Sequence, residues 1–113
     1  MIKREYKDYV NDIIDSINDI QQFIGAQSFD AFVKDRKTYN AVIRSIEIIG
    51  EAAKNIPESI KKNNNDLPWK QMVGMRDKLI HGYFGIDNEI LWKTVQVDIP
   101  SLLPIIKKAF QEK

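Results

Sequence analysis

The sequence contains no cysteine, which excludes a disulfide framework and any thiolate metal site. It contains a single histidine, so a metal centre built on several imidazoles is excluded as well. No apolar run approaches the ~20 residues that a transmembrane helix requires. The first residues, Met-Ile-Lys-Arg-Glu-Tyr, lead into a charged stretch, so we expect no signal peptide. These absences predict a cytoplasmic protein with no membrane partner.

An excess of charge of either sign is also missing. The formal net charge is +1 and the pI is near 7.9, whereas a sequence-independent DNA-binding protein is usually more basic. An RNA-processing site needs only a local cluster of positive charge, which composition does not reveal. The hydrophobic content of 43% and charged content of 29% are typical of a soluble globular protein. At 113 residues we expect one domain, spanning residues 1–113.

Apolar residues recur at steps of three and four along the first 24 residues, which indicates one face of an amphipathic helix. Gly25 is expected to end this helix. Asp35 precedes a second long helix, which should end near Asn55 because Pro57 disfavours helical geometry in the residue before it. The predicted apolar stripes are Ile2, Tyr6, Val10, Ile13, Ile17, Ile20 and Ile24 in the first helix and Tyr39, Val42, Ile43, Ile46, Ile49 and Ala53 in the second.

Shorter elements are predicted from capping and turn residues. Ser28 can cap a helical turn before the second long helix. The polar, asparagine-rich stretch 61–66 is expected to be a loop. Pro68 should open a third helix that runs to Ile80, because proline is tolerated at the first helical position.

Asp87 or Asn88 can cap a fourth helix, which Pro100 and Pro104 interrupt. We therefore expect a kink or two segments near Ile99. Together the elements predict an all-α, up-and-down bundle of four to five helices.

Residues 75–85, Met-Arg-Asp-Lys-Leu-Ile-His-Gly-Tyr-Phe-Gly, combine polar, apolar and glycine residues in a way that core packing alone does not require. Arg76 provides a permanent charge and a fork of N–H donors that suits phosphate. His81 can accept or donate a proton near neutral pH. Metal-free RNA cleavage needs proton transfer and stabilisation of transition-state charge, which these side chains can supply. In a simpler interpretation, Arg76 pairs with a surface carboxylate and His81 caps a helix C-terminus.

The motif Arg-Asp-x3-His-Gly-Tyr closely resembles the signature of the HepT-like branch of HEPN-domain proteins. Residues 44–54 are similar to the second helix of that family, and Trp69 and residues 91–100 also fit, so the resemblance covers nearly the whole chain. It implies a HEPN-like helical bundle and a small ribonuclease toxin that uses no cofactor. Arg76 and His81 would be its catalytic residues, and Asp77 would orient one of them.

The resemblance also implies the partners of the protein. A minimal nucleotidyltransferase antitoxin would inactivate it by transferring AMP to Tyr83, as in a type VII-like toxin–antitoxin system. The substrate would be RNA, and the chain would form a homodimer in which two motifs face one cleft. A single motif offers one base and one arginine, whereas two copies offer a base, an acid and two phosphate-binding arginines.

Other features have more ordinary interpretations. Glu47 and Glu51 share a helix face at i, i+4 spacing, but no further ligands complete a metal site, so we assign no metal. We expect them to form ion pairs with Arg44 and Lys54, although a supporting place beside Arg76 is open to them. The aromatic residues Trp69, Phe84 and Trp92 are candidates for core or interface anchors.

A rival function belongs to a different class of protein. The chain could be a non-catalytic helical binding subunit of a nucleotidyltransferase complex. An intact motif is necessary for cleavage but not sufficient, so the sequence leaves both functions open.

Overall fold

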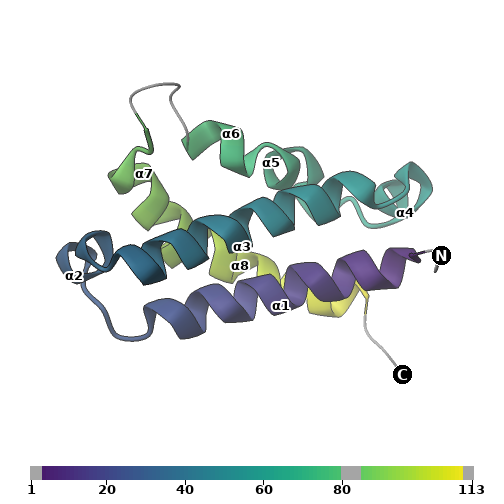
Figure 1. The fold of residues 1–113 in the computed structure, drawn as a ribbon. Helices are drawn as coiled ribbons and strands as arrows, with labels where there is room; N and C mark the ends of the chain where they lie inside the picture. The colour runs from purple at the N-terminus through teal and green to yellow at the C-terminus, as the bar shows by residue number, and fades with distance from the viewer. Residues whose placement is uncertain (1–3, 80–84, 111–113) are drawn as a thin grey trace.

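The computed structural model describes residues 4–79 and 85–110. They form the predicted all-α bundle, in which α1 and α3 lie side by side as the two longest helices (Figure 1). The pair α5–α6 packs on α3, α8 packs against α1, and α7 contacts α6. The helices are α1 (Tyr6–Ile24), α2 (Phe29–Lys34), α3 (Arg36–Asn55), α4 (Glu58–Asn63), α5 (Trp69–Val73), α6 (Met75–Leu79), α7 (Asn88–Lys93), a π-helical turn (Thr94–Asp98) and α8 (Ile99–Ala109).

The predicted stripes of α1 and α3 form the centre of the core. Ile13, Ile17 and Ile20 of α1 are fully buried, as are Val42 and Ile49 of α3. Full burial of one such side chain contributes about 1.5–3 kcal/mol relative to leaving it exposed. The pattern of steps of three and four is therefore confirmed as the packing face of both helices. Ile2, the first member of the α1 stripe, lies outside the described residues.

The predicted helix ends of this half of the chain are also confirmed. Gly25 ends α1 with a φ of 54°, a left-handed conformation that glycine adopts without steric cost. The Ser28 hydroxyl accepts a hydrogen bond from the Ala31 backbone N–H at the start of α2. At the start of α3, the Asp35 carboxylate accepts hydrogen bonds from the hydroxyl and backbone N–H of Thr38, and these lower the pKa of Asp35.

The prediction of one continuous third helix up to Ile80 is wrong. The structure has two five-residue helices, α5 and α6, with a break at Gly74. Glycine is about 1 kcal/mol less favourable than alanine inside a helix. The end of α5 also lies tightly against α3, since a Cβ on Gly50 would be 3.3 Å from the Val73 carbonyl oxygen. The chain thus turns at Gly74 and keeps both short helices on α3. Ile80 lies outside the described residues.

The predicted loop at 61–66 is only partly correct. Lys61, Lys62 and Asn63 form the end of α4. The helix extends this far because Ile60 packs against the core and the Asn64 side chain donates a hydrogen bond to the Ile60 carbonyl. The non-helical connection is therefore confined to residues 64–68.

The fourth predicted helix is interrupted as expected. The Asp87 carboxylate caps α7 by accepting hydrogen bonds from the N–H groups of Glu89 and Ile90. The predicted irregularity near Ile99 is a π-helical turn that ends at Asp98. It ends two residues before Pro100, which lacks an N–H donor and crowds the preceding turn, and a wider turn relieves that crowding.

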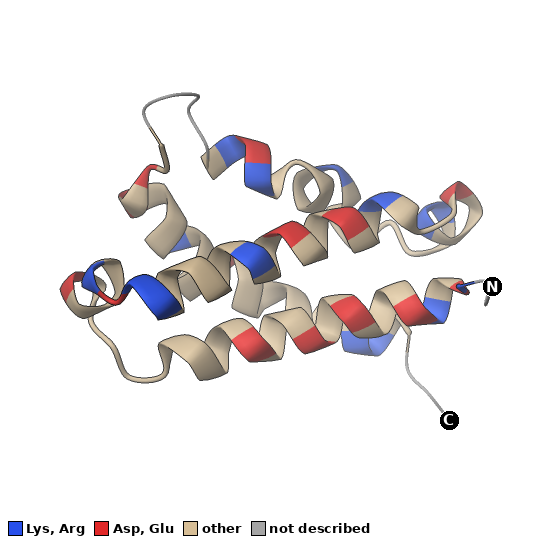
Figure 2. Cartoon of the chain, viewed as in Figure 1, with Lys and Arg blue, Asp and Glu red and all other residues tan. Residues whose placement is uncertain are grey.

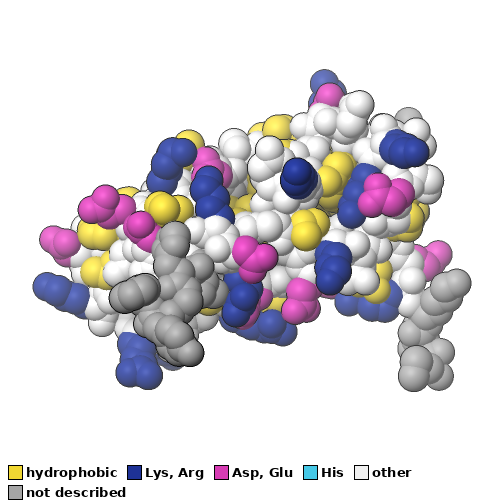
Figure 3. All heavy atoms as spheres, turned by 90° about the horizontal axis from the view of Figure 1, so that it is seen from above, with side chains coloured by type: hydrophobic (Ala, Val, Ile, Leu, Met, Phe, Trp, Pro, Cys, Tyr) yellow, Lys and Arg dark blue, Asp and Glu magenta, His cyan; other side chains and the backbone are white. Residues whose placement is uncertain are grey.

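The helices are amphipathic, and their outer faces carry both signs of charge. Figure 2 shows acidic residues in a row along α1 and a mixture of acidic and basic residues along α3. On the face formed by α5 and α6, basic, acidic and hydrophobic side chains are interspersed (Figure 3). In the described part of the chain, no helix is both long and apolar enough to span a bilayer.

Candidate functional site

The candidate motif begins on α6, whose five residues include Arg76 and Asp77. His81, Tyr83 and Phe84 lie outside the described residues. Leu79, the last residue of α6, is buried, and its carbonyl oxygen accepts a hydrogen bond from the Asp87 N–H at 3.1 Å. The two residues that flank the 80–86 segment are therefore in direct contact.

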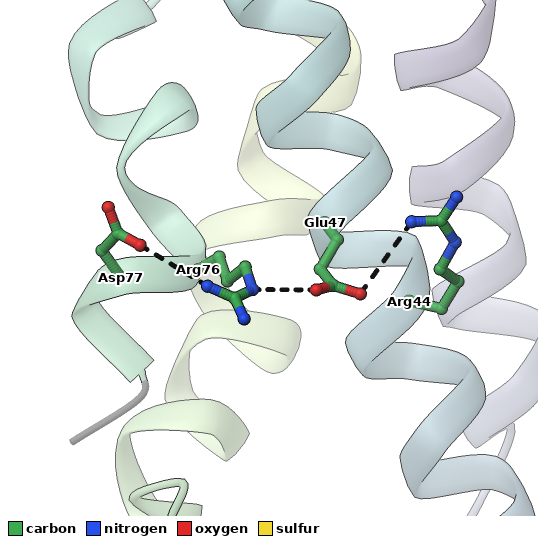
Figure 4. A network of polar contacts seen from close by, with 4 residues as sticks. All are labelled: Arg44, Glu47, Arg76 and Asp77. Atoms are coloured by element: carbon green, nitrogen blue, oxygen red, sulfur yellow. Dashed lines mark hydrogen bonds and ion pairs between the residues drawn. The ribbon is translucent and has the colours of Figure 1, made fainter. Parts of the chain in front are cut away.

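Arg76 makes its closest polar contact with Glu47 of α3 (Figure 4). The Nε–H group donates a hydrogen bond of 2.8 Å to Glu47 Oε2. This contact uses Nε, and neither Nη group makes a hydrogen bond to the residues that the structure describes. The Arg76 side chain is 49% exposed, so the guanidinium is partly open to solvent. The simpler interpretation of Arg76, an ion pair with a carboxylate, is therefore realised, but it leaves the phosphate-binding part of the side chain available.

Glu47 also lies near a second arginine. Arg44 Nη1 is 4.0 Å from Glu47 Oε1, as the i, i+3 spacing predicted. The Glu47 side chain is only 29% exposed, whereas that of Arg44 is 64% exposed. Glu47 is thus the least exposed member of the cluster in Figure 4, and the cluster contains equal numbers of positive and negative side chains.

Asp77 has a weaker contact with the motif arginine. Its Oδ1 atom lies 3.7 Å from Arg76 Nη1, and its side chain is 86% exposed. An exposed pair at this distance contributes little to stability. The expected orienting contact with Arg76 is therefore present but loose, and Glu47 provides the tighter one.

The position of α6 against α3 depends on close packing next to Glu47. Gly50, one helical turn after Glu47, lies directly under the backbone carbonyls of Met72 and Val73. The side chains of Met72, Met75 and Leu79 are buried in the core. These contacts fix the helix that carries Arg76 at hydrogen-bonding distance from α3.

The helix that follows the motif in the sequence, α7, also contacts α3. The Tyr39 hydroxyl donates a hydrogen bond to Asn88 Oδ1 at the start of α7. Burial raises the pKa of Tyr39, so the hydroxyl keeps its proton and remains a donor. α3 therefore holds the element before the segment through Glu47 and the element after it through Tyr39.

The sequence alone does not determine whether Glu47 or Glu51 contacts Arg76. The two residues are 29 positions apart, and no periodicity connects them. The structure places Glu47, and not Glu51, beside Arg76. The expected pair of Glu51 and Lys54 is absent from the ion pairs of residues 4–79 and 85–110. Within the same residues, no group of three or more potential metal ligands occurs.

Both tryptophans, Trp69 and Trp92, contact other residues of the same chain. Trp69 is 9% exposed, and its indole N–H donates to the Asn64 carbonyl oxygen at 3.0 Å. Trp92 packs against the rings of Phe29 and Phe32. Both therefore act as anchors of the fold, and neither is needed to explain an interface.

Comparison with known proteins identifies the family of the chain. A family model described as "Ribonuclease HepT-like" matches residues 13–109. A protein of Thermococcus cleftensis named "Probable ribonuclease HepT" is 54% identical over 101 residues, which cover 89% of this chain and 92% of that protein. A candidate RNase of Methanocaldococcus jannaschii is 43% identical over 112 residues, which cover 99% of this chain and 93% of that protein.

A candidate RNase of Caldanaerobacter subterraneus subsp. tengcongensis is 40% identical over 105 residues, covering 93% of this chain and 94% of that protein. No solved structure matches the chain significantly. The family match includes both helices of the Glu47–Arg76 contact and nearly the whole helical core. The chain belongs to the ribonuclease HepT-like family.

Proposed function

We propose that the chain is an endoribonuclease that cleaves RNA without a metal ion, with Arg76 and His81 as its catalytic residues. The proposal rests on which atoms of the Arg76 side chain are engaged by other residues and which are not. Glu47 binds it through Nε, and both Nη groups are without a hydrogen bond to the described residues on a half-exposed side chain. The names of the relatives support ribonuclease activity.

The proposed reaction is an attack of the ribose 2′-oxygen on the adjacent phosphorus atom. The 2′-oxygen–phosphorus bond forms, the bond from phosphorus to the 5′-oxygen breaks, and a proton moves from the 2′-hydroxyl to the leaving oxygen. His81 transfers a proton in this exchange. The Arg76 guanidinium stabilises the charge that develops on the phosphate oxygens. Asp77 has a supporting role through its contact with Arg76.

The biological setting that we propose follows from the family resemblance. The chain would be the toxin of a type VII-like pair, and a minimal nucleotidyltransferase antitoxin would silence it by transferring AMP to Tyr83. The active form would be a homodimer, because two motifs together supply the base, the acid and two arginines.

Purified protein and a labelled single-stranded RNA test the activity. Arg76→Ala and His81→Ala should each lower the cleavage rate by ~10²-fold or more, a typical scale for losing either function. Arg36→Ala removes an exposed arginine at the start of α3 and should cleave like the wild type. A chelator should leave the wild-type rate unchanged.

Circular dichroism should show that all three variants are folded, because Arg76 and Arg36 are exposed. Unchanged cleavage by folded His81→Ala protein would remove the catalytic assignment. Binding of RNA without any cleavage by the wild type would favour the non-catalytic binding subunit.

A further inference from the structure

A groove of about 610 Å³ shares α6 with the candidate site but does not include Arg76 or Glu47 in its lining. One wall is formed by α5 and α6, and the other by the end of α7, the π-helical turn and the start of α8. Its volume lies within the range of ligand clefts, ~300–1,000 Å³. None of the polar contacts described for Arg76 involves the lining of this groove.

The lining is dominated by positive charge. Lys70 of α5, Lys78 of α6 and Lys93 of α7 line the groove, and among the described residues Asp98 is the one carboxylate in its lining. Lys93 Nζ lies 4.0 Å from Asp98 Oδ1, the limit for an ion pair. Within the part of the chain that the structure describes, no carboxylate pairs with Lys70 or Lys78. The groove therefore has an excess of cationic groups.

The remaining lining suits a ligand that is both anionic and partly apolar. The apolar floor of the groove is small, because Met75 and Leu102 are 8% and 5% exposed and Met72, also in the lining, is fully buried. Lysine ammonium groups bind phosphate as flexible point charges and do not require one fixed geometry. A sugar–phosphate chain matches this combination, since its phosphates can reach the lysines while its sugars or bases cover the floor.

We propose that this groove binds the backbone of single-stranded RNA beside the phosphate that is cleaved. The inference rests on the proposed ribonuclease function. Arg76 and Lys78 are two residues apart on α6, about 3 Å along the helix axis and about 200° around it. The groove and Arg76 therefore lie on different sides of α6, so an RNA strand that contacts both must span this helix.

A local site of this kind is needed because the protein has little general attraction for RNA. The net charge is only +1, and the α5–α6 face mixes acidic, basic and hydrophobic side chains (Figure 3). Long-range steering by the whole molecule is therefore weak. Contacts to several phosphates in the groove raise affinity and make it dependent on salt.

Binding to a fluorescent single-stranded RNA tests the groove, with His81→Ala in every protein to prevent cleavage. The groove variant combines Lys70→Ala, Lys78→Ala and Lys93→Ala. The control variant combines Lys7→Ala, Lys62→Ala and Lys108→Ala, which removes the same charge from exposed positions on α1, α4 and α8. Each lost phosphate contact lowers the slope of log affinity against log salt by ~0.7, so the groove variant should lose about 2. The control should keep the wild-type slope.

A second measurement uses the proteins with His81 intact. Loss of the groove should raise KM for a long RNA by ~10-fold or more and leave cleavage of a dinucleotide unchanged, because a dinucleotide does not reach the lysines. Equal slopes for the groove and control variants would overturn the groove proposal and leave ribonuclease activity standing. A wild type that shows the groove-dependent slope without cleaving RNA would overturn the proposed function instead. Absence of any RNA binding would overturn both.

Discussion

At the scale of single residues, the site depends on one hydrogen bond between distant positions. Arg76 could turn in many directions from a short surface helix, since its side chain has several rotatable bonds. The 2.8 Å contact from Nε to Glu47 limits these directions without using the Nη groups. Glu47 therefore acts on the reaction through the orientation of Arg76, as a positioning residue.

Replacing Glu47 with glutamine should separate the effect of Glu47 on the orientation of Arg76 from its effect on the stability of the fold. An exposed ion pair contributes ~0–1 kcal/mol, so the free energy of unfolding of Glu47→Gln should change by less than about 1 kcal/mol. Misorientation of a catalytic group can cost up to ~10²-fold, so kcat should fall well below the wild-type value. KM should not rise, because the variant removes a negative charge near the bound phosphate. Steady-state cleavage kinetics and urea denaturation measure these effects.

The matched control is Glu51→Gln, which removes the same charge one turn later on α3. It should cleave like the wild type. The combination of Glu47→Gln with Arg76→Ala should be no slower than Arg76→Ala alone, since both changes affect the same contact. Wild-type kcat in Glu47→Gln would contradict the positioning role.

Tyr83 carries the proposed control of the enzyme. Transfer of AMP to its hydroxyl would add a phosphate charge two residues after His81 in the sequence, and this charge would compete with RNA for Arg76. Tyr83→Phe removes the acceptor oxygen but keeps the ring. Intact-mass spectrometry after incubation with the proposed nucleotidyltransferase antitoxin and ATP should show AMP on the wild type and none on Tyr83→Phe. Equal mass gains on both proteins would place the acceptor elsewhere.

At the scale of helices, the position of α6 depends on how closely α5 approaches α3. Gly50 has space for a hydrogen but little for a methyl group, because the Val73 carbonyl oxygen would be 3.3 Å from an added Cβ. A larger side chain at residue 50 would push α5 and α6 outward. The distance between Glu47 and Arg76 would then increase.

Gly50→Leu should lower the free energy of unfolding by roughly 1–3 kcal/mol, the usual cost of overpacking. Leucine is a better helix former than glycine, so this loss can only come from crowding. Cleavage should fall as well, since α6 moves away from Glu47. Gly74→Ala is the control, because its Cβ would be 3.4 Å from the Lys70 carbonyl oxygen and its backbone has a negative φ. A fully stable, fully active Gly50→Leu protein would show that this approach does not position the site.

The helices differ in how well the sequence predicts them. The stripes of α1 and α3 were predictable because local spacing alone determines which face is buried. The break at Gly74 was not, because it depends on the contact between α5 and Gly50, a residue of another helix. The same limit explains the site, in which Arg76 is evident from the motif while its partner Glu47 is set by tertiary packing.

At the scale of the whole molecule, we expect a homodimer with the motif helix near its two-fold axis. The reason is chemical, since one motif supplies a single base and a single arginine. The tryptophans no longer support this expectation, because Trp69 and Trp92 pack within the chain. Light scattering at micromolar concentration should give twice the chain mass of 13.1 kDa. A mass of one chain would contradict the dimer.

The hydrogen bond from the Asp87 N–H to the Leu79 carbonyl has a practical consequence for spectroscopy. The Asp87 amide proton exchanges with solvent only when the two residues flanking the 80–86 segment separate. Its exchange rate can therefore be followed by NMR in the unmodified protein, with RNA bound and after AMP transfer. One resonance would report whether ligands alter the contact between Leu79 and Asp87, independently of any assay of RNA cleavage.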